Sequence, residues 1–188
     1  MGCAHRHDAV VGSLGGDGHF DDAYGINNVG QVVGWGEAAD GHMYAFLWDP
    51  KTGVMRDLGT FPGGSWSAAR AINRAGQVLG DSGTADGSQQ AFLWDPTTGT
   101  VRELGTLPGG TGCFAGDIND AGQVVGDCRA ADGHSHAFLW DPATGTMRDL
   151  GVLPGDNYSY AYRINEAGQV VGDSQAADGR WHAFLWNP

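Results

Sequence analysis

GQVVGDCRAADGHSHAFLWDPATGTMRDLG, residues 122–151, is one of four near-copies of the same passage in this chain. Its phrase Ala-Phe-Leu-Trp begins at positions 45, 91, 137 and 183, in steps of 46 residues. Gly-Gln-Val begins at 30, 76, 122 and 168 with the same spacing, and Ile-Asn precedes each copy. A constant period of this length indicates a tandem array of structural units.

Each unit is predicted to contain four short β-strands. The first runs into Ile-Asn, the second is GQVVGDS, the third is AFLW, and the fourth is VMRDLG or TMRDLG. Asp-Gly and Asp-Pro-x-Thr-Gly between them favour tight turns. Glycine makes up 33 of 188 residues, which disfavours helix because each glycine costs about 1 kcal/mol there. The unbroken apolar run of the third strand predicts burial on both faces.

These units predict an all-β fold, a four-bladed β-propeller of four-stranded antiparallel blades. It forms one domain over residues 1–188, with repeats at about 11–57, 58–103, 104–149 and 150–188 plus 4–10. The chain ends after a third strand, and HRHDAVVGSLGG near its start aligns with GTMRDLGTLPGG. We therefore expect the N-terminal strand to close the last blade, leaving no open edge. Closure favours a monomer over a homodimer, and the alternative is an eight-bladed ring of two chains.

The charge limits the range of partners. Ten basic and 22 acidic residues give a net charge of −12, which repels nucleic acid and anionic membranes. No apolar run reaches the roughly 18 residues of a membrane span. The N-terminus lacks the apolar core of a secretion signal, so the protein stays inside the cell or a leader has been removed. No cofactor motif is present, and the His-x-His pairs lack a third metal ligand.

The phrases IN-x-x-GQVVG, HAFLW, G-x-M-x-DLG and LGTLPGG resemble the HAF repeats over essentially the whole chain. The family is named for the His-Ala-Phe phrase, seen here at 136–138 and 182–184, whereas Tyr44 and Gln90 replace the histidine in the other units. The resemblance implies a bacterial, mostly extracellular repeat protein of unassigned role, and no activity. It points outside the cell and the N-terminus points to the cytoplasm, so both locations stay open.

The places where the four units differ are the candidates for function. Repeated tryptophans such as Trp94 are expected in the core between blades. On the first strand, residues two, four and six before Ile-Asn share one face. Aromatic residues that are not repeated gather there and in the loop after the second strand: Phe20, Tyr24, Trp35, Trp66, Phe114, Tyr158, Tyr160 and Trp181. This set predicts a small-molecule or glycan site at the mouth of the central channel. The alternative is that these residues only fill gaps near the axis.

Two further functions are kept open. One is an enzyme in the same pocket, a cyclase, isomerase or lyase acting on an apolar substrate, with Arg70, Tyr162, Asp117 and Asp22 as its catalytic residues. The other is a protein interaction scaffold that uses the loops. The motifs of the common hydrolases, kinases and nucleotide-binding proteins are missing from the sequence.

Cys113 and Cys128 are predicted to face each other. A hairpin turn centred between Asp120 and Ala121 pairs these two positions across neighbouring strands. The same column holds serines in two other units. A disulfide and two free thiols are both compatible with this pairing, and in the cytosol the thiols are expected to stay reduced.

Overall fold

The computed structural model describes residues 11–15 and 21–188, and within them it contains fifteen β-strands and no helix, so none that could cross a membrane. Blade 1 contains β1 (Asp21–Ile26), β2 (Val32–Glu37), β3 (Met43–Asp49) and β4 (Val54–Asp57). Blade 2 contains β5 (Ser67–Ile72), β6 (Val78–Gly83), β7 (Gln89–Asp95) and β8 (Thr100–Glu103). Blade 3 contains β9 (Thr111–Ile118), β10 (Val124–Arg129), β11 (Ser135–Asp141) and β12 (Thr146–Gly151). Blade 4 contains β13 (Asp156–Ile164), β14 (Val170–Ala176) and β15 (Trp181–Trp186).

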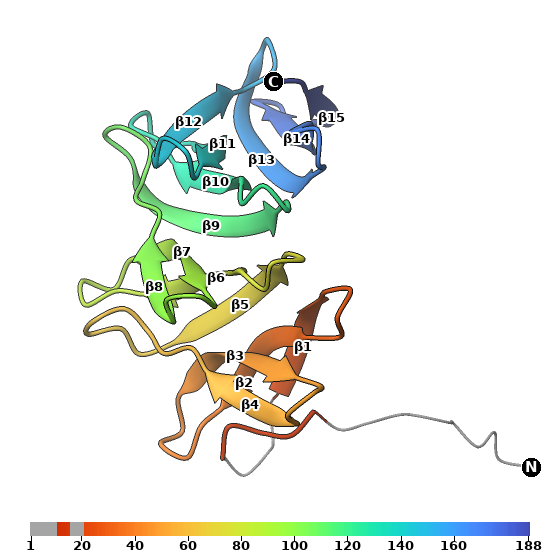
Figure 1. Ribbon diagram of the computed structural model, residues 1–188. Coiled ribbons are helices and arrows are strands. Elements are labelled where there is room, and N and C mark those ends of the chain that lie inside the picture. The colour runs from red at the N-terminus through yellow and green to blue at the C-terminus, as the bar shows by residue number, and fades with distance from the viewer. Residues whose placement is uncertain (1–10, 16–20) are drawn as a thin grey trace, which may run out of the picture.

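Each blade is a separate antiparallel sheet whose strands lie in chain order. Three sheets have four strands and the last has three. The first strands contact one another in the series β1, β5, β9, β13. They therefore follow the inner side of the arc that the four sheets make in Figure 1, with β4, β8 and β12 away from it. The predicted all-β architecture of repeated antiparallel sheets is confirmed.

The arc is open in this structure. Among the described residues, no strand of the first sheet is hydrogen-bonded to the last sheet. The segment 4–10, predicted to supply the missing strand of blade 4, lies outside the described residues. Closure into a four-bladed ring therefore stays a prediction.

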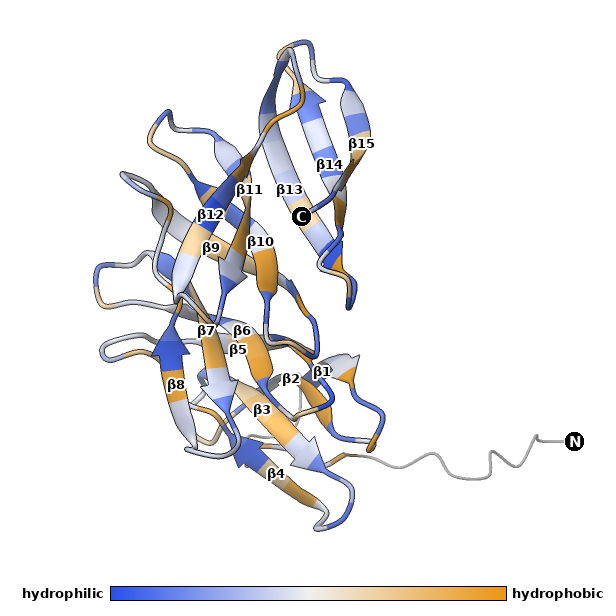
Figure 2. Cartoon of the chain, turned by 45° about the horizontal axis from the view of Figure 1, so that its top comes forward, coloured by the Kyte–Doolittle hydropathy of each residue, from blue (hydrophilic) through white to orange (hydrophobic). Residues whose placement is uncertain are grey.

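The core lies between the sheets. We call the side of a blade that meets the next blade its forward face, and the side that meets the preceding blade its rear face. Val125, Ala137 and Leu139 on the forward face of blade 3 pack on Ala161 and Val170 on the rear face of blade 4. The positions 46 and 92 residues earlier pack in the same way at the other two junctions. Apolar residues colour the middle strands orange in Figure 2, clearly so in β3, β6 and β10.

The Ile-Asn phrase is explained by a ladder of asparagine side chains. Asn27 Nδ2 donates to the carbonyl oxygen of Asn73 at 3.2 Å, Asn73 donates to Asn119 at 3.1 Å, and Asn119 donates to Asn165 at 3.1 Å. Each Oδ1 also accepts the backbone N–H of the glutamine four residues on. The motif thus fixes the turn within one blade and links that blade to the next.

Every first strand carries a β-bulge, at Tyr24, Arg70, Gly116 and Tyr162. The bulge adds a residue that has no partner on the second strand. It lets the residue at the bulge lie on the forward face while the isoleucine two residues later lies on the rear face. The second strand is held close here, since a Cβ on Gly126 would collide with the carbonyl oxygen of Phe114.

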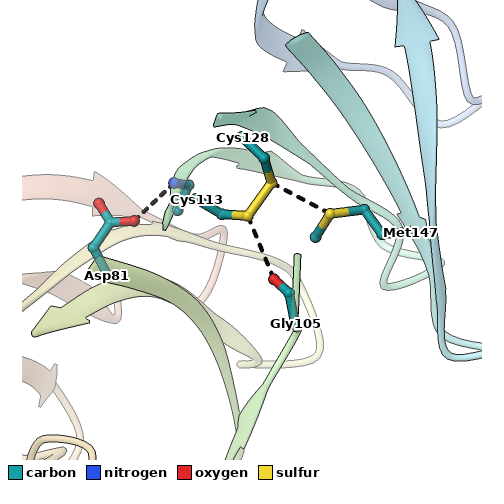
Figure 3. The surroundings of a disulfide bond; sticks show 6 residues. Asp81, Gly105, Cys113, Cys128 and Met147 are labelled. Carbon is teal, nitrogen blue, oxygen red and sulfur yellow. Dashed lines mark hydrogen bonds between the residues drawn. A yellow bond between two sulfur atoms is a disulfide. The ribbon is translucent and has the colours of Figure 1, made fainter. Parts of the chain in front are cut away.

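Cys113 and Cys128 are paired as predicted and form a disulfide, shown in Figure 3. The predicted turn centre was wrong, because the register next to the turn is centred on Ala121. The bulge at Gly116 then shifts the register by one residue and restores the cysteine pair. Gly105 O and Met147 Sδ approach the two sulfurs at 3.4 and 3.3 Å. These are packing contacts, because sulfurs in a disulfide carry no hydrogen.

The serines in the same column show what the disulfide replaces. Ser67 Oγ accepts the N–H of Ala45 at 2.8 Å and donates to the carbonyl of Gly59 at 2.6 Å. Ser159 makes the equivalent pair of bonds with Ala137 and Gly151. At this position a small polar side chain therefore joins one blade to the preceding blade.

We predict that reducing the disulfide lowers the free energy of unfolding by about 3 kcal/mol, the value for a closed loop of this length. The Cys113→Ser/Cys128→Ser double variant is expected to be more stable than the double alanine variant by about 1 kcal/mol, because serine restores the bonds between blades. Urea unfolding of the three proteins, with and without dithiothreitol, measures both differences. An unchanged midpoint on reduction of the native protein contradicts the prediction.

Candidate functional site

The bulged residues reach across to the second strand of their own blade. Trp35 Nε1 donates to the hydroxyl of Tyr24 at 2.8 Å in blade 1. Arg70 Nε donates to Asp81 Oδ2 at 2.9 Å in blade 2. Both pairs occupy the same position in the repeat. In these two blades the scaffold therefore holds one side chain of the inner strand against one side chain of the second strand. The inner residue differs between the blades, and its partner is Trp35 in blade 1 and an aspartate at the same position in the other three.

A cleft of about 210 Å³ lies between blades 1 and 2, lined by Tyr24, Trp35, Met43, Trp66, Ser67, Ala68 and Arg70. Four of these residues were predicted site residues: Tyr24, Trp35, Trp66 and Arg70. The guanidinium carbon of Arg70 lies 5.3 Å from the centre of the Tyr24 ring. The cleft therefore has aromatic walls with one cation beside them.

A second hollow of about 240 Å³ shares Tyr24 and Arg70 with this cleft and continues along the inner strands. Asp117 and Arg163 also line it, so its polar groups are two guanidiniums and one carboxyl group. Tyr24 and Arg70 thus border an aromatic space on one side and a polar space on the other.

Asp81 fixes the direction of the Arg70 side chain. Its carboxylate is buried and accepts both Arg70 Nε and the backbone N–H of Ala115, the latter at 2.7 Å. Burial is the largest influence on Asp81 and raises its pKa, while the bonds from Ala115 and Arg70 act in the opposite direction. The structure shows that Arg70 has this carboxylate as its partner, a residue that was not among the predicted site residues.

Asp117 is bound by backbone donors on both sides. Its Oδ1 accepts the N–H of Ile118 at 2.9 Å, and its Oδ2 accepts the N–H of Ile164 in blade 4 at 3.2 Å. Burial raises the pKa of Asp117, and these donors and Arg163 oppose the rise. This geometry gives Asp117 a part in joining blades 3 and 4. Asp22 lies exposed on β1, opposite Trp35. The catalytic roles of these two residues stay predictions.

The other predicted aromatic residues gather on blade 4 or stand apart from the cleft. Tyr160 and Trp181 have ring centres 5.6 Å apart, and Tyr158 meets His134 edge-on at 4.6 Å. Burial, which is the larger cause, and the charge of Asp173 raise the pKa of Tyr162, the fourth member of this group. Phe114 is half-exposed on β9, and Phe20 lies outside the described residues. The predicted single set is therefore divided between the first two blades and the last.

Sequence reasoning missed Asp127. It occupies the position of Asp81, but the residue at its bulge is Gly116, so no side chain of the first strand reaches it. Burial raises the pKa of Asp127 to about 6, with a further rise from Asp81 and an opposing hydrogen bond from Ser135. A comparison of the repeats could have identified Asp127. Gly116 stands where the other units have a large side chain, while the aspartate that faces this position is kept.

No protein-family model and no curated protein matches the sequence. Solved structures do match. A protein of Agrobacterium tumefaciens described as TolB superposes with a TM-score of 0.69 at 14% identity, over 93% of this chain and 64% of that one. TolB of Acinetobacter baumannii superposes with a TM-score of 0.57 at 20% identity, over 94% of this chain and 45% of that one. The β-propeller domain of the Trilobed protease of Pyrococcus furiosus superposes with a TM-score of 0.58 at 13% identity, over 89% of this chain and 49% of that one.

These likenesses show the fold, a β-propeller arrangement of blades. At such low identity they say nothing of activity. The chain spans less than two thirds of the length of each of these structures. The resemblance to the HAF repeats stays a prediction.

We predict that Asp127→Asn stabilises the protein at pH 7 by roughly 1 to 3 kcal/mol and has almost no effect near pH 4. With a pKa of about 6 against an ordinary 3.8, the folded protein keeps a proton that the unfolded chain loses between these values. The contribution of Asp127 to stability therefore falls as the pH rises through that window. Urea unfolding of both proteins at the two pH values measures the difference. An equal effect of the substitution at both pH values contradicts the prediction.

Proposed function

We propose that the protein binds a small molecule or glycan in the cleft between blades 1 and 2. The observation that carries this proposal is the group of Tyr24, Trp35 and Trp66 around a guanidinium whose direction is set by the buried Asp81. Aromatic faces bind flat rings or the apolar faces of sugars, and a positioned cation bonds hydroxyl or carboxylate oxygens. The cleft and its adjoining hollow together fall within the ~300–1,000 Å³ typical of ligand sites.

The equivalent place at the next junction argues against simple gap filling. There the repeat puts Arg70, Asp81, Gln89 and Gly112 at the positions of Tyr24, Trp35, Met43 and Trp66. Blades 2 and 3 nevertheless pack through the same apolar residues as blades 1 and 2. Packing of two blades therefore does not require aromatic residues at these positions, which supports a role in binding.

The geometry also favours a ligand that is polar on one side. The aromatic wall of the first cleft and the two guanidiniums of the second hollow meet at Tyr24 and Arg70. A sugar acid or an aromatic carboxylate has this combination of a ring and an anionic group. The Arg70–Asp81 pair would present one rigid donor group to it, with little loss of side-chain freedom on binding.

We predict that Trp66→Ala weakens binding at least about tenfold while leaving the melting temperature nearly unchanged, since it removes one wall of the cleft and no residue of the core between blades. A panel of sugar acids and aromatic carboxylates, titrated while tryptophan fluorescence is followed, supplies the measurement. Phe114→Ala is the control, an aromatic truncation outside the cleft.

Equal loss of binding in the Phe114→Ala and Trp66→Ala variants places the ligand elsewhere. Unfolding of Trp66→Ala shows that the residue belongs to the core. Trp35→Phe then distinguishes the two cases, because it keeps an aromatic ring and loses only the bond to Tyr24.

A further inference from the structure

The forward face of blade 4 is uncovered. In blade 3, Val125 and Leu139 are 0% and 8% exposed because blade 4 packs on them. The residues 46 positions later, Val171 and Leu185, are 45% and 57% exposed. Blade 4 thus presents the same apolar surface that every other blade buries against its successor, and solvent-facing patches of this kind mark interaction sites.

The rear face of blade 1 is uncovered as well. Ile118 and Ile164 are 7% and 8% exposed, whereas Ile26 at the same position in blade 1 is 70% exposed. Val32 and Trp48 on the same face are only partly buried, while Val124 and Trp140 are buried. Blades 4 and 1 therefore present, among the described residues, two surfaces that match each other residue by residue, one of each kind found at an internal junction.

Polar groups continue the same pattern. Asn165 Nδ2 bonds Gln169 of its own turn, and in the described part of the chain it has no carbonyl of a following blade to donate to. The carbonyl oxygen of Asn27 accepts the N–H of Gly30, and residues 11–15 and 21–188 supply no second bond like the one that Asn73 receives from Asn27. Within the described chain, the asparagine ladder thus ends in a donor on blade 4 and an acceptor on blade 1, neither of which is bonded to another blade.

The stacking of arginine on tryptophan is also found only at the junctions between the described blades. Arg56 lies over Trp94, Arg102 over Trp140 and Arg148 over Trp186, each arginine coming from the preceding blade. Among the described residues, Trp48 has no such cation. In the part of the chain that the structure describes, the sheet of β15 has three strands where the other sheets have four, and a hollow of about 90 Å³ lies beside Phe184 and Trp186.

We propose that two copies of this chain form a closed eight-bladed ring, in which the forward face of blade 4 of each copy packs on the rear face of blade 1 of the other. The internal junctions show what covers each surface: a blade of this same repeat, joined by Val-Leu packing and by one asparagine bond. Two such junctions close a ring around a twofold axis. The expectation of a monomer assumed that the N-terminal strand closes blade 4 within one chain, whereas among the described residues no strand of blade 1 is hydrogen-bonded to blade 4.

The curvature of the arc favours the second copy over closure within one chain. The four blades superpose with a TM-score of 0.58 on a β-propeller domain of which they span 49%. Four blades of this chain thus follow only part of that larger propeller domain.

Light scattering coupled to size exclusion tests the ring on the 188-residue chain. We expect twice the 19.7 kDa mass of one chain. Leu185→Arg is expected to raise the dissociation constant of the dimer about tenfold or more, because it puts a charge in the centre of both junctions. Val54→Arg is the matched control, equally exposed at 58% but at a position where Thr100 and Thr146 are also exposed in other blades. A single-chain mass for the native protein overturns the two-copy ring, as does equal dissociation by both variants.

Crosslinking separates a second copy from closure within one chain. Asp120 N donates to the carboxylate of Glu166 one blade later, so the corresponding pair across the new junction is Glu166 with Asn28. Asn28→Cys and Glu166→Cys are combined in a chain with Cys3→Ser, and the products are separated without reductant. A covalent dimer supports the ring of two copies. A crosslinked monomer means that the chain closes on itself and overturns it, and so does the lack of any crosslink.

Discussion

Each sheet of this chain is apolar on both faces, so no blade can bury its own core, and the whole structure depends on one blade covering the next. The third strand shows this most directly. Its alternate residues, such as Leu139 and Trp140, point to opposite neighbours, and both are buried. The asparagine ladder and the stacked arginines add directed bonds to this packing. Burial of the sheet faces supplies most of the stability, and the polar bonds set the register between neighbouring blades.

The candidate site follows from what this scaffold leaves free. Packing fixes the apolar residues of the middle strands, whereas the bulged residue differs in kind from blade to blade and its partner across the sheet is Trp35 in blade 1 in place of the aspartate of the other blades. At one junction this position holds Tyr24 with Trp35, and at the next it holds Arg70 with Asp81. The proposed cleft needs both, because the first pair provides the aromatic wall and the second provides a cation in a fixed direction.

The sequence was sufficient to predict the strands and their order, because these depend on local turns and on a period of 46 residues. The pairing of Cys113 with Cys128 was predicted correctly only because the bulge at Gly116 offsets the error in the predicted turn centre. It was not sufficient for the partner of Arg70, since a bulge re-aims the inner strand and a bulge leaves no clear mark in the sequence. The curvature of the arc could not be predicted from the sequence either. It is set by small rotations between packed sheets, which are summed over the blades, and no single residue determines it. This is why the aromatic residues, expected in one pocket, lie in two groups.

Hydrogen exchange, followed at protein concentrations above and below the dissociation constant of the proposed dimer, tests most directly whether every blade needs a neighbour on both faces. We predict that amides of β2 and β14, in blades 1 and 4, lose protection on dilution, while those of β6 and β10 keep it. Protection that is equal in all four blades and independent of concentration would contradict it, because the end faces would then be covered within one chain.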